Sequence, residues 1–283
     1  MTRLKTHDIA GLAEHLAAYD TELIAKTGCS LKGIACRAAG MGETSFQRLA
    51  PRTSIAVVPA TAGRGIIAGF CDAVAGIALH MGCRAFVTRN VDVAGLKEAF
   101  EKKAGVLMLA DDDCFAAIDI RSRRVSHNSD ATGRGFAQAL ELMAGGVKNR
   151  EVLVIGCGPV GAGAALCLSR LGAQVCLNDI VDRRCRDLSA VLTRLADSRI
   201  RIARGLEPAL AAHRLIVDAS PAAGIIGADH ITAHTRVSAP GVPSGPTAEA
   251  RVKLGDRLLH DPLQLGVATM IADIVNLNVA TLR

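Results

Sequence analysis

The fold is decided by residues 151–180, EVLVIGCGPVGAGAALCLSRLGAQVCLNDI. This stretch begins with a short apolar run of the kind that forms a buried parallel strand. Gly156, Gly158 and Gly161 then give the pattern G-x-G-x-x-G, which precedes an expected helix over 162–171 and a second strand over 174–177. Asp179 follows Gly161 by eighteen residues. The order of strand, glycines, helix, strand and acid predicts a dinucleotide-binding unit.

Each part of this stretch has a physical role in such a unit. Gly156 allows the tight turn, Gly158 lets the backbone approach a pyrophosphate, and Gly161 lets helix and strand pack closely. The start of the helix, at Pro159 and Val160, offers the positive end of the helix dipole to the phosphates, and free N–H groups from Val160 onward, since Pro159 has none. The alternative is a glycine-rich turn in an α/β domain that binds no cofactor.

The acid at the end of the second strand bears on the choice of cofactor. The carboxylate of Asp179 can accept a hydrogen bond from a ribose 2′-OH and would repel a 2′-phosphate, so NAD is favoured over NADP. Arg183 and Arg184 follow closely in the sequence and keep NADP open.

Length and composition exclude several classes of function. The chain has 283 residues, half of them hydrophobic, which suits two domains of ordinary size. One Tyr, six Phe and no Trp argue against stacking on nucleic-acid bases. The net charge of +6 is scattered, and the basic clusters at 121–124 and 183–186 fit solvated turns and helix faces better than a polyanion site.

The nine cysteines indicate a reducing compartment. None stands in a C-x-x-C pair or in a spacing with His that is typical of zinc, so no metal site is expected. Cys157, Cys167 and Cys176 lie inside the dinucleotide unit, where they are expected to be small buried hydrophobes. The sequence shows no secretion signal and no apolar run long enough to span a membrane. We therefore expect a cytoplasmic protein without a membrane partner.

The pattern of apolar residues predicts an α/β protein of two domains. Residues 1–130 are expected to form an N-terminal helix and a small α/β substrate domain, residues 131–260 a Rossmann domain, and residues 261–283 a closing helix that can pack back on the first domain. The expected helices are Thr6–Lys26 with Thr6 as N-cap, 66–81, 93–103, 132–143, 182–197 and 261–282. The expected strands are 54–58, 84–88, 105–109, 152–155, 174–177, 199–202, 215–218, 236–238 and 257–260. Residues 30–52 are expected to be irregular.

Three places in the first domain can carry chemistry, because ligands bind where strands end. The loop Pro59–Gly65 can cradle a carboxylate with its N–H groups, or it is only a turn from strand to helix. Asp111–Asp113 places three carboxylates at a strand end; neighbours this close disfavour each other's ionised form, which suits a base, and they can hold an ammonium group. A solvated turn with a helix cap is the alternative. Asn128 reads as a turn residue more readily than as a polar contact.

Several segments, taken in order, resemble the PylD family of pyrrolysine-forming dehydrogenases. They cover most of the chain, and the acidic and proline-glycine segments are more specific than the glycine pattern. The segments are VVPATAGRGII (57–67), VLMLADD (106–112), Asn128, the GCGPVG turn, DASP (218–221), SAPGVP (238–243) and DPLQLGVATM (261–270).

This resemblance implies NAD-dependent oxidation of the terminal amine of 3-methylornithyl-Nε-lysine. Loss of ammonia then gives a semialdehyde, which the ornithine α-amine closes to the pyrroline ring. Asp111 would hold or deprotonate the reacting amine. The residues implied for the substrate are Leu4, at the start of a covering helix, Thr61, Ala62, Gly63, Asp112 and Asn128. Those implied for the cofactor are Gly156, Gly158, Pro159, Val160, Gly161 and Asp179, with Ser220, Pro221, Pro240 and Gly241 beside the nicotinamide.

The sequence also departs from the pattern of that family. Arg64 stands where a small polar residue is expected, Asp113 stands where a basic residue is expected, and the segment 40–52 is longer than expected. An amine or imino-acid dehydrogenase with another substrate, and an NAD-sensing protein without catalysis, therefore stay open. The expected partner is a small lysine-derived molecule, with no nucleic acid, and a homodimer is left open.

Overall fold

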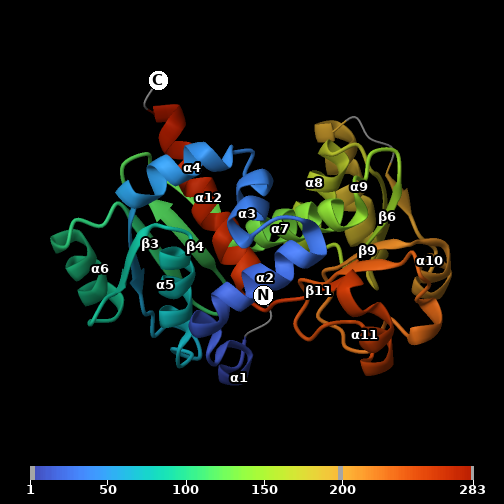
Figure 1. Ribbon diagram of the computed structural model, residues 1–283, viewed down its shortest axis with the longest axis horizontal. Coiled ribbons are helices and arrows are strands. Elements are labelled where there is room, and N and C mark those ends of the chain that lie inside the picture. The colour runs from blue at the N-terminus through green and yellow to red at the C-terminus, as the bar shows by residue number, and fades with distance from the viewer. Residues whose placement is uncertain (1–3, 197–199, 282–283) are drawn as a thin grey trace. The chain divides into compact units, whose positions relative to one another are not determined.

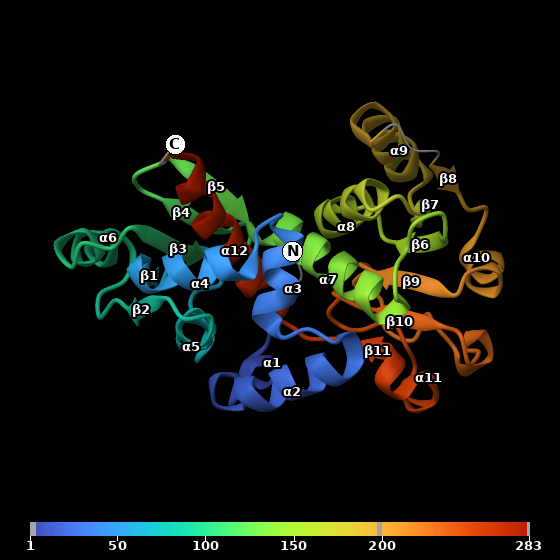
Figure 2. The same ribbon diagram turned by 45° about the horizontal axis from the view of Figure 1, so that its top comes forward.

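The computed structural model describes residues 4–196 and 200–281, which fold into two compact units. The first unit comprises Met1–Glu22, Ser30–Ala131 and Leu263–Arg283, and the second comprises Leu23–Cys29 and Thr132–Pro262. Figure 1 and Figure 2 label the elements of both units. The chain passes between the units within helices α2, Leu16–Thr27, and α7, Asn128–Ala144.

The first unit is built on a mixed five-stranded sheet with the order β2-β1-β3-β4-β5. Parallel pairing joins β1 to both β2 and β3, whereas β3, β4 and β5 follow one another antiparallel. Strand β1 therefore ends between the ends of β2 and β3, and its loop lies beside theirs. The strands are β1 Ser54–Val58, β2 Arg84–Val87, β3 Val106–Ala110, β4 Phe115–Asp119 and β5 Arg124–His127.

Helices cover both faces of this sheet. Ala56 and Val58 on β1 share a cluster with Ala99 of α6, Asp92–Glu101. Because strand residues alternate between faces, Ile55 and Val57 point to the opposite face. Two helices that contact each other as well as the sheet pack there: α5, Phe70–His80, and α12, Gln264–Thr281. The closing helix α12 thus belongs to the first unit (Figure 2).

The second unit is a parallel sheet of six strands with the order β11-β10-β9-β6-β7-β8. Read from β8, this is the 3-2-1-4-5-6 order of a dinucleotide-binding fold, and the order reverses between β6 and β9. Ligands of such sheets bind at the carboxyl ends of the strands beside that reversal. The strands are β6 Glu151–Ile155, β7 Gln174–Asn178, β8 Arg201–Ile202, β9 Leu215–Asp218, β10 Arg236–Ser238 and β11 Leu258–Leu259.

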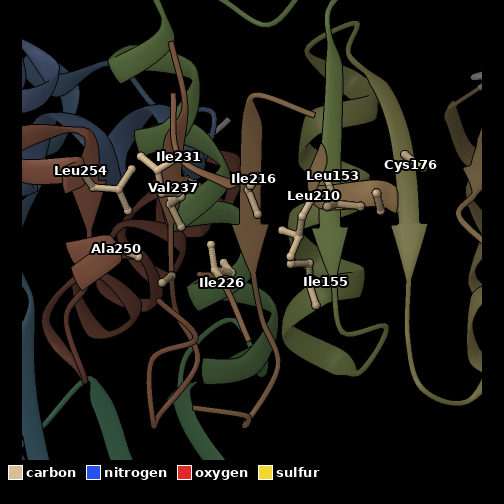
Figure 3. Close-up of a cluster of buried hydrophobic side chains, with 12 residues drawn as sticks. Leu153, Ile155, Cys176, Leu210, Ile216, Ile226, Ile231, Val237, Ala250 and Leu254 are labelled. Atoms are coloured by element: carbon tan, nitrogen blue, oxygen red, sulfur yellow. The ribbon is translucent and has the colours of Figure 1, made fainter. Parts of the chain in front are cut away.

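A cluster of buried apolar side chains lies under one face of this sheet (Figure 3). Leu153 and Ile155 on β6 and Ile216 on β9 are buried against α10, Leu206–Ala212, and α11, Ala248–Leu254. The other face carries α8, Pro159–Arg170, and α9, Asp182–Ala196. Helices on both faces explain why β6 reads as a nearly continuous apolar run. The predicted α/β fold class is confirmed by this arrangement.

The expected N-terminal helix Thr6–Lys26 is wrong as a single element. The chain forms α1, Thr6–Ile9, a 3₁₀ turn η1, Leu12–His15, and then α2. Gly11 interrupts the helix because its φ is 68°, in the left-handed region, and the ring of His15 bonds back to its carbonyl at 2.7 Å. Thr6 is the first helical residue, and Lys5 rather than Thr6 is the N-cap. Gly28 ends α2 as expected, with φ 72°.

Residues 30–52 are not irregular as expected. They form α3, Leu31–Ala38, α4, Glu43–Leu49, and the 3₁₀ turn η2, Ala50–Arg52. The Ser30 hydroxyl caps α3 by accepting from the Gly33 N–H at 3.2 Å, and the apolar face of α3 is buried against α12. The helix has only eight residues and contains Gly33, so it is too short to be stable by itself, and tertiary burial supplies its stability.

Other elements differ in extent or were not expected. Helix α5 begins at Phe70 rather than at 66, and α7 begins at Asn128 rather than at 132. The strands β4 and β5 and the helices α10 and α11 were missed. Residues 197 and 199 of the expected helix 182–197 and strand 199–202, and Leu282 of the closing helix, lie outside the described residues.

Candidate active site

The turn after β6 needs two of its three glycines for packing within the protein. Gly156 has φ 88°, and a Cβ there would lie 2.9 Å from the carbonyl carbon and oxygen of Ala219, in the loop after β9. A Cβ at Gly161 would overlap the carbonyl oxygen of Gly156. Both contacts are with backbone, which cannot move aside as a flexible side chain can. These glycines therefore fix the turn against α8 and the next loop.

Gly158 is different, because a Cβ there would meet no protein atom within 4 Å. Its lack of a side chain is not required by contacts within the protein. The helix α8 begins directly after it, and no side chain caps the first N–H groups of the helix. An open glycine beside uncapped N–H groups and a positive helix end suits a phosphate. The residues present thus fit the pyrophosphate of a dinucleotide.

Asp179, directly after β7, holds the turn together. One carboxylate oxygen accepts from the N–H of Cys157 at 2.7 Å and the other accepts from the N–H of Val181 at 2.8 Å. Its side chain is only 5% exposed, and Arg184 lies 4.0 Å away with a side chain that is 60% exposed. Each oxygen keeps a further lone pair that can accept from a ribose hydroxyl. Arg184 is one of the two basic residues that keep NADP open in the sequence analysis.

The loops after β9 and β10 meet each other at a buried carboxylate. Asp218 is fully buried and accepts from the Ser220 hydroxyl at 2.6 Å and from the Gly245 N–H at 2.9 Å. Burial raises its pKa, although these hydrogen bonds oppose the shift. A Cβ at Gly241 would overlap the Ser220 carbonyl oxygen. The structure thus brings the predicted residues Ser220 and Gly241 together with the Gly156 turn, and Pro221 and Pro240 lie beside them in the chain.

Two residues in this unit were not found from the sequence. Ile180, directly after Asp179, is a fully exposed apolar side chain, as suits a surface that covers an adenine. Ser244 is buried, and among the described residues its hydroxyl has no hydrogen-bond partner. Because protein atoms enclose this hydroxyl oxygen, it does not face a space that a cofactor could occupy. The position of Ile180 directly after Asp179 could have been noticed in the sequence, whereas no feature of the sequence marks Ser244.

In the first unit, the loop after β1 is held by carboxylates on both sides. Asp92 accepts from the Thr61 N–H at 2.8 Å and from the Thr61 hydroxyl at 2.5 Å, and these bonds, the hydroxyl first, hold its pKa below the ordinary value. Asp112 accepts from the Arg64 N–H at 2.7 Å. A Cβ at Gly63 would overlap the Asp112 carboxylate. The loop with Thr61, Ala62 and Gly63 therefore lies against Asp112, as a common site requires.

Asp111 is exposed at the end of β3, with one carboxylate oxygen in use. Its Oδ1 accepts from the N–H groups of Asp113 at 2.9 Å and Cys114 at 2.8 Å, and its own N–H donates to the Cys114 carbonyl. Within the described part of the chain, Oδ2 has no hydrogen-bond partner. The backbone turn thus orients the side chain and leaves one oxygen available to a proton or an ammonium group.

The remaining predicted substrate residues lie elsewhere in the first unit. Asn128 is the first residue of α7, and its amide donates to the sulfur of Met270 on α12 at 3.4 Å. Leu4 is half-buried and lies ahead of α1. Their place at a substrate site stays a prediction.

All nine cysteines are free thiols, and the three in the dinucleotide unit are buried as expected. The Sγ atoms of Cys157 and Cys185 are 3.5 Å apart, and burial raises the pKa of both thiols. Burial also raises the pKa of Cys36 and of Cys83 to about 12. Such thiols are protonated and unreactive at neutral pH. The described residues contain no group of three or more His, Cys, Asp or Glu that would hold a metal ion.

One open hollow of about 510 Å³ lies in the second unit, at the amino ends of β9 and β10. It is lined by Glu207, Arg214, Asp229 and His230, whose ring bonds to Glu207 at 2.8 Å. None of the predicted site residues lines it, and cofactors bind such sheets at the carboxyl ends of the strands. We therefore place the active site at the loops and not at this hollow. No helix of the described residues is both long and apolar enough to cross a membrane.

Two family models match successive parts of the chain. Residues 8–126 match the N-terminal domain of the pyrrolysine biosynthesis protein PylD, and residues 129–235 match the C-terminal domain of alanine dehydrogenase/PNT. A pyrrolysine synthase of Methanosarcina acetivorans is 28% identical over 277 residues, which cover 97% of this chain and 100% of that protein. A pyrrolysine synthase of Methanosarcina barkeri is also 28% identical, over 97% of this chain and 98% of that protein.

Solved structures of dehydrogenases share the fold. Quinate dehydrogenase from Corynebacterium glutamicum, in complex with NAD, has a TM-score of 0.54 and 15% identity, over 81% of this chain and 99% of that chain. Shikimate dehydrogenase from Aquifex aeolicus has a TM-score of 0.51 and 17% identity, over 78% of this chain and 90% of that chain. At these identities the likeness concerns the fold, a first domain followed by a dinucleotide-binding domain.

Proposed function

We propose that this chain, which belongs to the PylD family of pyrrolysine biosynthesis proteins, oxidises the terminal amine of 3-methylornithyl-Nε-lysine with a nicotinamide cofactor. The observation that carries the proposal is that one chain has both a dinucleotide turn, in its second unit, and a loop bordered by carboxylates, in its first unit. The turn suits a pyrophosphate, and the carboxylates suit a substrate that carries ammonium groups. Curated relatives over the whole length of the chain bear the name pyrrolysine synthase, which supports the substrate.

The second unit would hold the cofactor, which supplies a hydride acceptor when bound. The uncapped N–H groups at the start of α8 would donate to its pyrophosphate, and the open side of Gly158 would admit it. Asp179 would accept from the adenosine ribose, which favours NAD. The loops tied together by Asp218 would border the nicotinamide.

Asp111 would prepare the amine for oxidation. A protonated amine has no lone pair to assist the departure of hydride from its carbon, so one proton must leave first. The free Oδ2 of Asp111 can bind the ammonium group and then accept this proton, while Oδ1 stays fixed by two N–H donors. Asp112 adds negative charge that favours an ammonium at this place, and it holds the Thr61–Gly63 loop.

The later steps follow from the chemistry of the product. Loss of a hydride from the amine-bearing carbon leaves an iminium ion, and water adds to its carbon. Ammonium then departs to give a semialdehyde, and the α-amine of the ornithine part condenses with the aldehyde and loses water. The ring imine of pyrrolysine results. The protein would need only to keep the substrate folded so that the α-amine reaches the aldehyde.

The proposed reaction is tested by mixing purified protein with NAD and 3-methylornithyl-Nε-lysine. We expect NADH absorbance to rise together with one ammonia per turnover and the mass of pyrrolysine. NADH formation from a different amine and none from this one would show an altered substrate. NAD binding without turnover of any amine would show a binding protein instead of a dehydrogenase.

The variant Asp111→Asn tests the assigned role of the carboxylate. The amide oxygen can still accept from the N–H groups of Asp113 and Cys114, so the turn is kept while charge and basicity are lost. We expect turnover to fall by about a thousandfold or more, with NAD affinity and melting temperature close to those of the unmodified protein. Asp113→Asn, an exposed neighbour, is the matched control. Lower stability with turnover retained would assign Asp111 a structural role.

A further inference from the structure

Asp92, in the segment that follows the neighbouring strand β2, holds the loop that carries Thr61 by hydrogen bonds. Asp92 follows β2, and it makes three hydrogen bonds to the loop after β1. Its own N–H donates to the carbonyl of Pro59 at 2.9 Å, and its two carboxylate oxygens accept from the N–H and the hydroxyl of Thr61 at 2.8 and 2.5 Å. No motif in the sequence marks this residue, which lies thirty-one positions beyond Thr61.

Asp92 is held in an unfavourable conformation while it makes these contacts. Its φ is 51°, in the left-handed region, although it is the first residue of α6. An Asp at a helix start ordinarily caps its own helix, but here no side chain caps α6 and the carboxylate reaches back to Thr61. A Cβ at Gly95 would lie 2.6 Å from the Asn90 carbonyl oxygen and 2.8 Å from Cγ1 of Val58, so α6 starts close against the segment that follows β2 and against the end of β1. The loop contact is therefore made at some cost to the local backbone.

The contact fixes the direction of the hydroxyl proton of Thr61. A carboxylate can only accept, so the single hydroxyl hydrogen points to Asp92 and is not available to a ligand. What Thr61 can offer to the substrate is a lone pair of its oxygen. A hydroxyl in this state binds N–H donors and repels carboxylates.

We infer that Asp92 is a positioning residue that makes Thr61 an acceptor for an ammonium group of the substrate. This inference rests on the proposed function, and it adds a recognition element to it. The loop lies against Asp112 through Gly63 and Arg64, so two acidic residues, Asp92 and Asp112, flank it, with Asp111 next to Asp112 in the chain. Arg64 is the basic residue of the loop, and its backbone N–H is held by Asp112. An oxygen acceptor among these carboxylates suits a cation.

The variant Asp92→Asn separates the direction of the hydroxyl from the shape of the loop. Its amide oxygen can still accept from the Thr61 N–H, but its NH₂ group then donates to the Thr61 oxygen. The hydroxyl hydrogen would turn toward the substrate and oppose an ammonium group. We expect affinity for 3-methylornithyl-Nε-lysine, measured by calorimetry without NAD, to fall about tenfold. Thr61→Val should lose as much, and Thr61→Ser should keep most of the affinity.

A double-mutant cycle tests whether the two residues act through one contact. Asp92→Asn should have almost no further effect in the Thr61→Val protein, because the hydroxyl that it orients is gone. Glu101→Gln is the matched control. Glu101 is an exposed acid on the same helix, and its carboxylate forms an ion pair with Lys97 and not a contact with the loop. Additive losses from Asp92→Asn and Thr61→Val would overturn the inference.

Ligands that lack one amine identify the group that Thr61 contacts. Three analogues of the substrate, each with a different amine replaced by methyl, are measured with the unmodified protein and with Asp92→Asn. The tenfold difference between the two proteins should disappear for one analogue. A difference that persists with all three would overturn the contact to an ammonium group.

Failure of this inference can be told from failure of the proposed function. If the unmodified protein oxidises the substrate and Asp92→Asn binds it equally well, the inference is wrong and the proposed function stands. If the unmodified protein neither binds nor oxidises the substrate, the proposed function fails, and the ammonium contact fails with it. Hydrogen exchange of the Thr61 amide still reports the contact with Asp92 in that case, and it should be faster in Asp92→Ala.

Discussion

In the second unit the loops after β6, β9 and β10 are held by close backbone contacts in addition to the carboxylates of Asp179 and Asp218, whereas in the first unit the loop after β1 is held by the carboxylates of Asp92 and Asp112. Gly156, Gly161 and Gly241 each lie where a Cβ would strike a neighbouring carbonyl group. In the first unit Asp92 and Asp112 reach the loop with hydrogen bonds. Backbone contact tolerates no added atom, but carboxylates tolerate changes of shape and are sensitive to charge. The two regions should therefore fail in different ways when they are altered.

The largest effect on stability is expected from Gly161→Ala. The added methyl group would overlap the carbonyl oxygen of Gly156, which is a backbone atom and cannot move aside as a flexible side chain can. We expect the free energy of unfolding to fall by about 2–4 kcal/mol, as for other overpacked sites, and cofactor binding to be lost. Thermal unfolding measures this. The control is Gly158→Ala, whose methyl group meets no atom within 4 Å. Equal melting temperatures for the two variants would contradict the account of the turn.

The sequence-based interpretation succeeded in the second unit and was incomplete for the loop after β1 in the first unit. The dinucleotide unit was predicted because its glycines, its strands and Asp179 lie within thirty consecutive residues, and each has a local reason to be there. The hydrogen bonds from Thr61 to Asp92 were not predictable, because they join residues that follow different strands and depend on the strand order β2-β1-β3.

The errors in the fold also arise where tertiary contacts outweigh local pattern. The strand β4 has the sequence FAAID, in which two alanines and an acid give little strand propensity, and its pairing with β3 decides its structure. Helix α3 has only eight residues, and it packs against α12, which comes more than two hundred residues later. The break at Gly11 was not predicted because the apolar spacing continues across it.

The next effect separates binding from stability at a single glycine. In Gly158→Val the side chain enters the space beside the start of α8 and not a protein atom. We expect affinity for NAD to fall about a hundredfold, while the melting temperature stays within about 2 °C of that of the unmodified protein. Titration calorimetry and thermal unfolding measure the two quantities, with Ala190→Val on α9 as the control. Unchanged affinity in the folded variant would remove the pyrophosphate from this turn.

A smaller effect is expected on the choice between NAD and NADP. Asp179, which we propose as the acceptor for the adenosine ribose, is held by two N–H groups, and Arg184 is 4.0 Å away. Asp179→Ser should raise the relative use of NADP by about tenfold, because the repulsion of a 2′-phosphate is removed. Arg184→Ala should lower it. The ratio of kcat/KM for the two cofactors measures both. A preference of the unmodified enzyme for NADP would show that Asp179 does not select the cofactor.

The smallest effect is a difference in pH dependence between two buried carboxylates, one in each unit. Glu98 on α6 accepts from the Lys102 ammonium and from the N–H groups of Asn90 and Arg89, which lowers its pKa from 4.5 to about 2. Its contribution to stability is full above its ordinary pKa and is lost as the pH falls toward 2. Asp218 has a raised pKa, chiefly because it is buried. Its contribution is full below its ordinary value of 3.8 and is lost as the pH rises through the raised pKa.

Two amide variants reveal these opposite signs. The loss of melting temperature in Glu98→Gln should shrink as the pH is lowered from about 7 to about 3, because the unmodified protein loses the same ionised group. The loss in Asp218→Asn should grow over the same range, because the unmodified protein gains stability when its buried carboxylate becomes protonated. Each variant is compared with the unmodified protein at every pH, so that changes in other groups cancel. Parallel trends for the two variants would mean that burial does not dominate the pKa of Asp218. Its hydrogen-bond donors, the N–H and hydroxyl of Ser220 and the N–H of Gly245, would then keep it ionised, as Lys102 and Asn90 keep Glu98 ionised.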